Sequence, residues 1–171
     1  EDGNAQAQVD YSEVDPSWHM PAKYYSFVRP EGSASPMIEF FIFDSDYPHF
    51  RNEDVQEWLD ASIAASRATW KILVMHHPIY TDGKHGDDEQ GNNEYLFPII
   101  CNKIDLVLSG HDHNFSHLRK NDPGCPIEQL VVGTGGASIR TNVTDTEAEV
   151  VKRGDFHGFG WIEATTNKIT F

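Results

Sequence analysis

Two short apolar segments of this chain each run directly into histidine. Residues 106–109 are followed by Gly110 and then by the sequence His111-Asp112-His113, and residues 71–75 run into His76 and His77. An apolar segment of this length predicts a buried strand. Ligand groups collect at the carboxyl ends of the strands in an open α/β sheet. The pattern therefore predicts a metal site at one edge of an α/β sheet.

Strand and helix patterns occupy most of the remaining chain. The expected strands are 24–28, 38–43, 71–75, 106–109, 115–119, 129–132, 159–164 and 168–171, and the expected helices are 53–69 and 93–103. Short polar segments join the first two strands and the last two, which predicts a hairpin at each end. Residues 1–23 are expected to be irregular, and residues 140–156 to form an exposed polar excursion. The sequence predicts one domain with a mixed α/β layered fold.

The chain is strongly acidic. Its 27 Asp and Glu residues outnumber its 13 Lys and Arg residues, which gives a formal net charge of −14. This charge repels a phosphate backbone, so we expect no nucleic-acid partner, and an anionic substrate would need a local cation such as a metal ion. No apolar run approaches the roughly 20 residues of a membrane-spanning helix. The chain lacks an initiator Met and a signal peptide, so we expect it to be processed or excised.

Two cysteines and two glycosylation sequons bear on where the protein works. Cys101 and Cys125 flank the strand 106–109, and the sequence leaves open whether they form a disulfide. The sequon at Asn114 falls inside the expected site and is expected to be unmodified. The sequon at Asn142 lies in a polar loop and would be usable in a secreted protein.

The His-X-His motif of His111 and His113 occurs in several classes of metalloprotein. Cupins, amidohydrolases, metallo-β-lactamases and phosphoesterases all use it. A metallo-β-lactamase would carry an Asp-His pair just after His113, and a cupin an acidic residue three or four positions later, where this chain has His117. Two surface imidazoles on a turn are the alternative without a metal. His76, at the end of a second strand, favours metal binding.

The neighbours of these histidines have expected roles of their own. Asp112 points away from both flanking imidazoles if the segment is extended, so it either orients an imidazole or stabilises a turn. Of the adjacent pair His76 and His77, only one is expected to face the site, and the other to pack or form hydrogen bonds. His85 lies in a long glycine-rich loop and can reach a substrate.

Other residues near the strand ends are assigned structural roles. Asp44 ends the strand 38–43 and is expected to cap a turn rather than bind metal. The segment 133–136 lacks the spacing of a dinucleotide loop, so its glycines are expected to let the backbone pass close to the pocket. The remaining histidines are expected to be structural: His19, His49, His117 and His157.

These motifs resemble the calcineurin-like metallophosphoesterases and, within them, the purple acid phosphatases of the small tartrate-resistant type. The specific part is the sequence from Gly110 to Asn114 following a His-His-Pro strand at 76–78, and His85-Gly86 and Gly158-Phe159 support it in order. The resemblance implies an αββα sandwich with mixed sheets. It also implies an extracytoplasmic, secreted glycoprotein.

The resemblance further implies an acid phosphatase that hydrolyses phosphate monoesters at a dinuclear centre, by attack of a metal-activated water. His76 and His111 would bind one metal ion and His113 the other. The usual pairing is Fe with Fe, Zn or Mn. His85 would bind phosphate or protonate the leaving group, while Asp112 and Asn114 would support the ligands without binding metal.

The amino-terminal motifs of that family are missing from this chain. They include a Gly-Asp-X-Gly aspartate, a bridging aspartate, a tyrosine and a Gly-Asn-His-Asp motif, so residues 1–171 are expected to be the carboxyl-terminal half of one catalytic domain, with three of seven ligands. Alone, the chain is expected to bind metal weakly and to catalyse poorly. A phosphodiesterase on the same fold and a non-catalytic remnant or binding domain are the alternatives.

Overall fold

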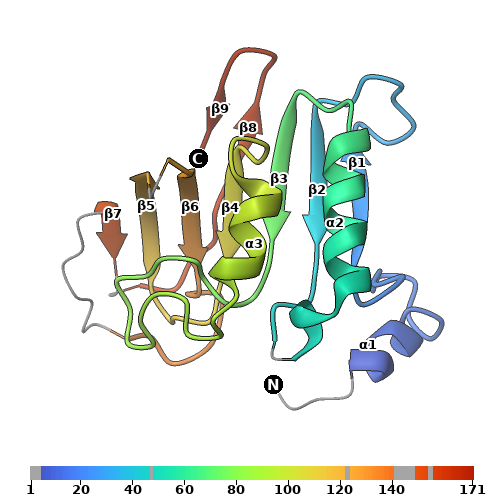
Figure 1. Ribbon diagram of the computed structural model, residues 1–171. Helices are drawn as coiled ribbons and strands as arrows, with labels where there is room; N and C mark the ends of the chain where they lie inside the picture. The colour runs from blue at the N-terminus through green and yellow to red at the C-terminus, as the bar shows by residue number, and fades with distance from the viewer. Residues whose placement is uncertain (1–4, 47, 122–123, 141–148, 154–155) are drawn as a thin grey trace.

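One large sheet forms the centre of the molecule (Figure 1). The computed structural model describes residues 5–46, 48–121, 124–140, 149–153 and 156–171. The strands of the sheet are β1 (Tyr25–Arg29), β2 (Ile38–Ile42), β3 (Trp70–Val74), β4 (Leu106–Ser109), β5 (Phe115–Asn121), β6 (Pro126–Val132) and β7 (Glu149–Arg153). The other elements are α1 (Ala5–Tyr11), η1 (His49–Arg51), α2 (Glu53–Ala65), α3 (Asn93–Ile100), β8 (Glu163–Ala164) and β9 (Ile169–Thr170).

The sheet has the order β1-β2-β3-β4-β6-β5-β7 and is mixed. Strands β2, β3, β4 and β6 run parallel to one another, and β1, β5 and β7 pair antiparallel at the two sides. The first predicted hairpin is confirmed as β1 and β2. The parallel centre brings the carboxyl ends of β2, β3 and β4 to one edge, which is the geometry that the strand pattern predicted.

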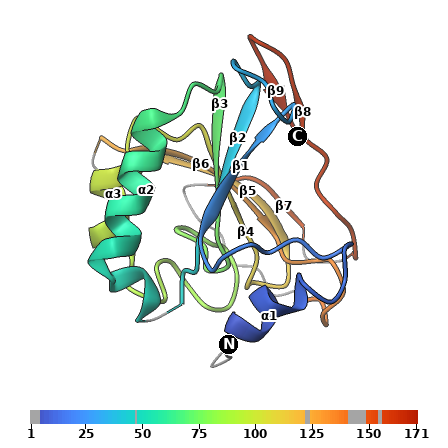
Figure 2. The ribbon, with the colours of Figure 1, turned by 90° about the vertical axis from the view of Figure 1, so that its right-hand side faces the viewer.

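Helices α2 and α3 cover one face of the sheet (Figure 2). Asn52 caps α2 by accepting the backbone N–H of Asp54 at 2.9 Å. The buried stripe of α2, which packs into the main core, is Val55, Leu59 and Ile63. The helix ends at Ala65, four residues earlier than predicted, because the side chain of Ser66 accepts the N–H of Ala68 and competes with helix hydrogen bonds.

The opposite face carries a second, smaller hydrophobic cluster. Ile72, Leu106 and Leu130 are buried there, and Ile162 and Ile169 from the C-terminal segment pack against them. The predicted closing hairpin is present as the short pair β8 and β9. Among the residues that the structure describes there is one large sheet with α2 and α3 on one face, so the second large sheet of the αββα sandwich is not part of them.

Two elements lie in segments that we expected to be irregular. Helix α1 buries no residue, so it has no apolar stripe to reveal it, and a hydrogen bond of 2.8 Å from Gln6 to Asp10, one turn apart, supports it instead. Strand β7 falls in the expected excursion at 140–156 and pairs with β5. Its two consecutive valines favour a strand, but the charged residues on either side led us to predict an exposed polar segment instead. Within the described part of the chain, no helix is long and apolar enough to cross a membrane.

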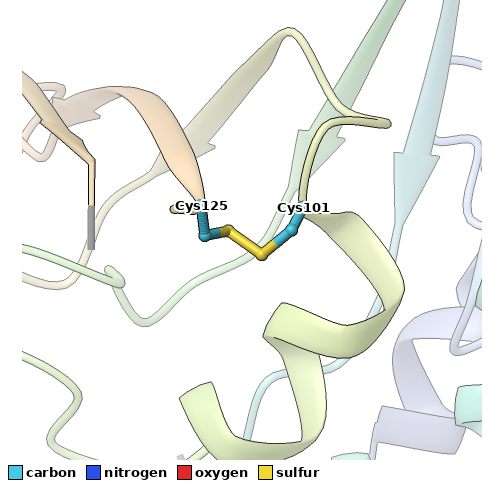
Figure 3. The surroundings of a disulfide bond; sticks show 2 residues. All are labelled: Cys101 and Cys125. Carbon is cyan, nitrogen blue, oxygen red and sulfur yellow. A yellow bond between two sulfur atoms is a disulfide. The ribbon is translucent and has the colours of Figure 1, made fainter. Parts of the chain in front are cut away.

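Cys101 and Cys125 form a disulfide, which settles the alternative that the sequence left open (Figure 3). The bond joins the C-terminal cap of α3 to the residue before β6, with the Cα atoms 4.9 Å apart. It thereby links the end of α3 to the start of β6, which pairs with the strand β4 that leads to His111. Disulfides of this kind persist in oxidising compartments.

We expect the paired replacement Cys101→Ser and Cys125→Ser to lower the free energy of unfolding by about 3 kcal/mol. The bond closes a loop with a sequence separation of 24 residues, and its loss restores conformational entropy to the unfolded chain. Urea unfolding followed by circular dichroism measures the difference. An unchanged transition midpoint would show that the bond does not contribute to stability.

Candidate metal centre

The candidate site lies where β3 and β4 end side by side. Pairing continues beyond the strands, because Met75 N–H donates to the Leu108 carbonyl at 3.0 Å and Gly110 N–H to the His76 carbonyl at 3.1 Å. These bonds keep the backbones of the two segments paired, so that His76 and His111 lie at the same end of the sheet. The backbone of His111 has a φ of 65°, a left-handed conformation that is strained for a residue other than glycine. Such strain persists only where the surroundings fix it, and it is common at functional sites.

The imidazoles of His76 and His111 converge on one point. The Nδ1 atom of His111 lies 3.1 Å from the Nε2 atom of His76. Two nitrogen ligands, each about 2.1 Å from one metal ion, lie roughly 3.0–3.4 Å apart at octahedral to tetrahedral angles. The observed separation therefore fits a shared ion, and the neutral imidazole is the common nitrogen ligand for Fe and Zn.

His77 also reaches this cluster. Its ring centroid lies 4.5 Å from that of His111, and ligand nitrogens of His76, His77 and His111 all lie within 4.8 Å of one another. The predicted hydrogen-bonding role is present as well, because Nδ1 of the buried His77 lies 3.0 Å from Ser45 Oγ. Ser45 follows β2, so three adjacent parallel strands contribute to the site.

Glu89 bridges two histidines, a role that no sequence motif indicated. Its Oε2 lies 2.5 Å from His111 Nε2, and its Oε1 lies 3.1 Å from His85 Nδ1. Burial raises the pKa of Glu89, but the hydrogen bonds from His85 and His111 and their charges outweigh burial and leave the pKa below its usual value. The ring centroids of His85 and His111 are 4.0 Å apart, so the loop histidine does reach the strand-end cluster.

Asp112 anchors the loop that carries His85. The carboxylate is 1% exposed; its Oδ2 accepts the Thr81 hydroxyl at 2.7 Å. Its Oδ1 accepts the backbone N–H groups of Lys84 at 2.9 Å and His85 at 3.3 Å. Asp112 therefore acts on the loop backbone, whereas the sequence suggested an imidazole or its own turn as the partner.

Two glycines allow the chain to close around Asp112. A Cβ atom on Gly83 would lie 2.1 Å from Asp112 Cγ, and a Cβ on Gly133 would lie 1.8 Å from the Asp112 carbonyl oxygen. The expectation that the glycine segment lets the backbone pass close to the site is confirmed at Gly133. Arg140 follows that segment, and its Nη1 lies 2.7 Å from His85 Nε2 and 3.8 Å from Asp112 Oδ1.

His113 lies outside the cluster around His111. Neither group of clustered ligand atoms among the described residues includes it. Its Nδ1 lies 2.8 Å from the carbonyl oxygen of Ser138, so Nδ1 carries the proton and Nε2 is left as the atom able to bind a metal.

Asn114 and Asp44 form local polar contacts. The Asn114 amide donates to the buried Asp82 carboxylate at 2.7 Å, and the Gly133 N–H donates to the Asn114 carbonyl, which ties the motif to the glycine segment. Asp44 accepts the N–H of Asp46 at 3.0 Å and lies 2.7 Å from His49 Nδ1. Asp44 also borders a cleft of about 410 Å³ that opens beside His76 and His77.

We expect no glycan at the Asn114 sequon in material from a secretory host. Asn114 is 1% exposed and its amide nitrogen donates to Asp82, so a glycosyltransferase has no access to that nitrogen in the folded chain. Mass spectrometry of the peptide, with and without glycosidase, checks this. Full occupancy of Asn114 would contradict the buried placement. The second sequon, at Asn142, lies outside the described residues.

The chain is similar to phosphatases in sequence and in fold. A family model described as calcineurin-like phosphoesterase matches residues 7–115. Purple acid phosphatase 7 of Arabidopsis thaliana is 28% identical over 99% of this chain and 56% of its own length. Human tartrate-resistant acid phosphatase type 5 is 27% identical over 68% of the chain and 41% of its own length.

A solved structure shares the fold. The structure described as GAP50, the anchor in the inner membrane complex of Plasmodium, aligns with a TM-score of 0.72 at 24% identity. The alignment covers 90% of this chain and 52% of that one. The chain thus spans about half, or less, of the lengths of the relatives that it matches.

Proposed function

Because the chain belongs to the calcineurin-like phosphoesterase family and is related to the purple and tartrate-resistant acid phosphatases, we propose that it forms part of a metal-dependent phosphatase site. The observation that carries the proposal is the convergence of His76 Nε2 and His111 Nδ1, 3.1 Å apart at the ends of two parallel strands. Phosphate monoesters are the proposed substrates. The disulfide supports an extracytoplasmic setting for this activity.

His76 and His111 would hold one metal ion, and His113 would contribute to a second. Fe paired with Fe, Zn or Mn is the proposed content, consistent with nitrogen ligands of this type. Bound metals would polarise the phosphate ester and lower the pKa of a water molecule at the site. The carboxylates that such a centre requires would come from the amino-terminal half of the catalytic domain, outside residues 1–171.

His85 and Arg140 would bind the phosphate group. The guanidinium of Arg140 lies against His85 Nε2, and its side chain is 33% exposed, so it can present N–H groups to an oxyanion. A fixed positive charge here matters because the chain as a whole carries a net charge of −14 and repels anions. Asp112 would hold the loop and the guanidinium in this arrangement.

The test is hydrolysis by the complete polypeptide that contains these residues. The proposal predicts that p-nitrophenyl phosphate is hydrolysed, that a chelator abolishes the activity, and that added Fe or Zn restores it. Faster hydrolysis of bis(p-nitrophenyl) phosphate would favour a phosphodiesterase. Absence of hydrolysis with metal bound would favour a binding domain, and would contradict the catalytic proposal.

Replacing His85 by alanine in that polypeptide is expected to lower kcat about 100-fold while the metal content stays unchanged. His85 contacts Arg140 and Glu89, and general acid–base or phosphate-binding histidines contribute on this scale. The exposed His19, which lies outside the cluster, gives the matched control His19→Ala. Loss of metal in His85→Ala would mean that His85 is a ligand.

A further inference from the structure

The carboxylate of Glu89 makes one hydrogen bond with each of its oxygens, and both partners are site histidines. Oε2 faces His111 Nε2 at 2.5 Å, and Oε1 faces His85 Nδ1 at 3.1 Å. On the far sides of the two rings, His111 Nδ1 faces His76 and His85 Nε2 faces Arg140. Glu89 is therefore the central member of a hydrogen-bonded series of side chains. The series links the candidate metal ligands His76 and His111 to Arg140, the candidate phosphate-binding residue.

The donor Arg140 and the acceptor Glu89 in this hydrogen-bonded series determine which ring nitrogens of His85 and His111 carry protons. Arginine can only donate hydrogen bonds, so Arg140 requires His85 Nε2 to accept. The His85 proton is then on Nδ1, where it is donated to Glu89. An ionised carboxylate can only accept, so it requires a proton on His111 Nε2. In a neutral His111 ring the lone pair then lies on Nδ1, which is the nitrogen that faces His76.

The backbone around Glu89 is held in place on both sides. Asp88 N–H donates to the Ile79 carbonyl at 3.2 Å, and Asp88 Oδ1 accepts the N–H groups of Asn92 at 2.7 Å and Asn93 at 3.1 Å. The second pair of bonds ties the segment to the start of α3. The backbone that carries Glu89 is therefore held by hydrogen bonds, and the Glu89 carboxylate has a defined position.

We propose that Glu89 is a positioning residue that sets the tautomer of His111 and keeps His111 Nδ1 free of a proton for the metal. In the absence of substrate, Glu89 also accepts the Nδ1–H of His85, whose Nε2 accepts from Arg140. A ligating histidine commonly donates its other N–H to a carboxylate, which orients the ring and raises its basicity. The role in metal binding rests on the proposed function, whereas the tautomers belong to the chain itself.

The alternative is that Glu89 binds metal directly. Ligand atoms of His85, Glu89 and His111 lie within 4.8 Å of one another, so this grouping is sterically open to an ion. The two roles make different predictions for His85. If Glu89 acts through His111, His85 contributes nothing to metal affinity. If Glu89 is a ligand with His85 and His111, removing His85 weakens binding as much as removing Glu89 does.

The deciding experiment is ¹⁵N NMR of the histidine rings at pH 8 in the metal-free form of the complete polypeptide that contains these residues. We expect the Nε2–H form for His111 and the Nδ1–H form for His85. In Glu89→Ala the His111 ring should become a mixture of tautomers, whereas Arg140 still holds His85 in the Nδ1–H form. In Glu89→Gln the His111 tautomer should shift as well, because the single acceptor oxygen of the amide cannot accept from both rings. The control Glu57→Gln replaces an exposed carboxylate on α2 and should leave both unchanged.

The proposal is overturned if His111 carries its proton on Nδ1, or if Glu89→Ala leaves the His111 tautomer as it was. A Co²⁺ titration of the complete polypeptide adds the metal readout. Glu89→Ala should raise the dissociation constant about 10- to 100-fold, and His85→Ala should not change it. An equal rise in His85→Ala would overturn the positioning role in favour of direct ligation. Failure of the phosphatase assay would leave the tautomer result intact, so the two proposals fail separately.

Discussion

Replacing His111 by alanine is expected to remove the metal ion of one position and most of the turnover of the complete polypeptide. His111 is the centre of the histidine cluster, since its ring centroid lies within 4.9 Å of those of His76, His77 and His85. Residues that only support a ligand contribute 10- to 100-fold to metal affinity, so loss of a ligand should exceed about 100-fold. Elemental analysis and phosphatase assays measure the two effects.

A companion variant separates the two proposed metal positions. His113 hydrogen-bonds to Ser138 and lies outside the cluster around His111, so His113→Ala should empty the other position and spare the first. His19→Ala is the control for loss of an imidazole elsewhere. Wild-type activity and full metal content in either His111→Ala or His113→Ala would overturn that ligand assignment.

Gly133→Ala is expected to destabilise the fold by about 3 kcal/mol, at the upper end for overpacking. The new Cβ would lie 1.8 Å from the Asp112 carbonyl oxygen and 3.2 Å from His113 Cα. Both are backbone atoms, so no side chain can turn aside to make room. The backbone of the His-Asp-His segment must shift, and metal affinity should fall with stability.

The same segment offers a matched control for this variant. A Cβ on Gly135 meets nothing within 4 Å, and its backbone is not left-handed. Gly135→Ala should therefore leave the free energy of unfolding within about 0.5 kcal/mol of wild type, as expected for open surface positions. Urea unfolding of both variants gives the comparison. Equal urea midpoints for Gly133→Ala and Gly135→Ala would show that the close approach of Gly133 to the Asp112 backbone does not affect stability.

The elements that the sequence predicted well are those with an apolar pattern. Strands β3 and β4 and helix α2 each bury a face, and their positions follow from that pattern. Helix α1 buries nothing, and no apolar period marks it. Strand β7 is defined by its pairing with β5, a contact between distant parts of the chain that local composition does not encode.

The residues of the candidate site also differ in whether the sequence predicted them. His76 and His111 were predictable because parallel neighbouring strands must end at one edge of the sheet. Glu89 and Arg140 were not, because they reach His85 through the path of the long loop and of the segment after β6. That path depends on tertiary contacts such as the bonds from Asp112 to the loop backbone. Glu89 is one acidic residue among several in its loop, and no spacing distinguishes it.

The most direct test of the account is the metal content of the complete polypeptide, purified from its natural source without chelators. Elemental mass spectrometry gives moles of each transition metal, and the intact mass gives moles of protein. The account predicts two ions per polypeptide, drawn from Fe, Zn and Mn, with about one lost in His111→Ala. Absence of bound transition metal would contradict the proposed metal centre, and the phosphatase proposal would fall with it.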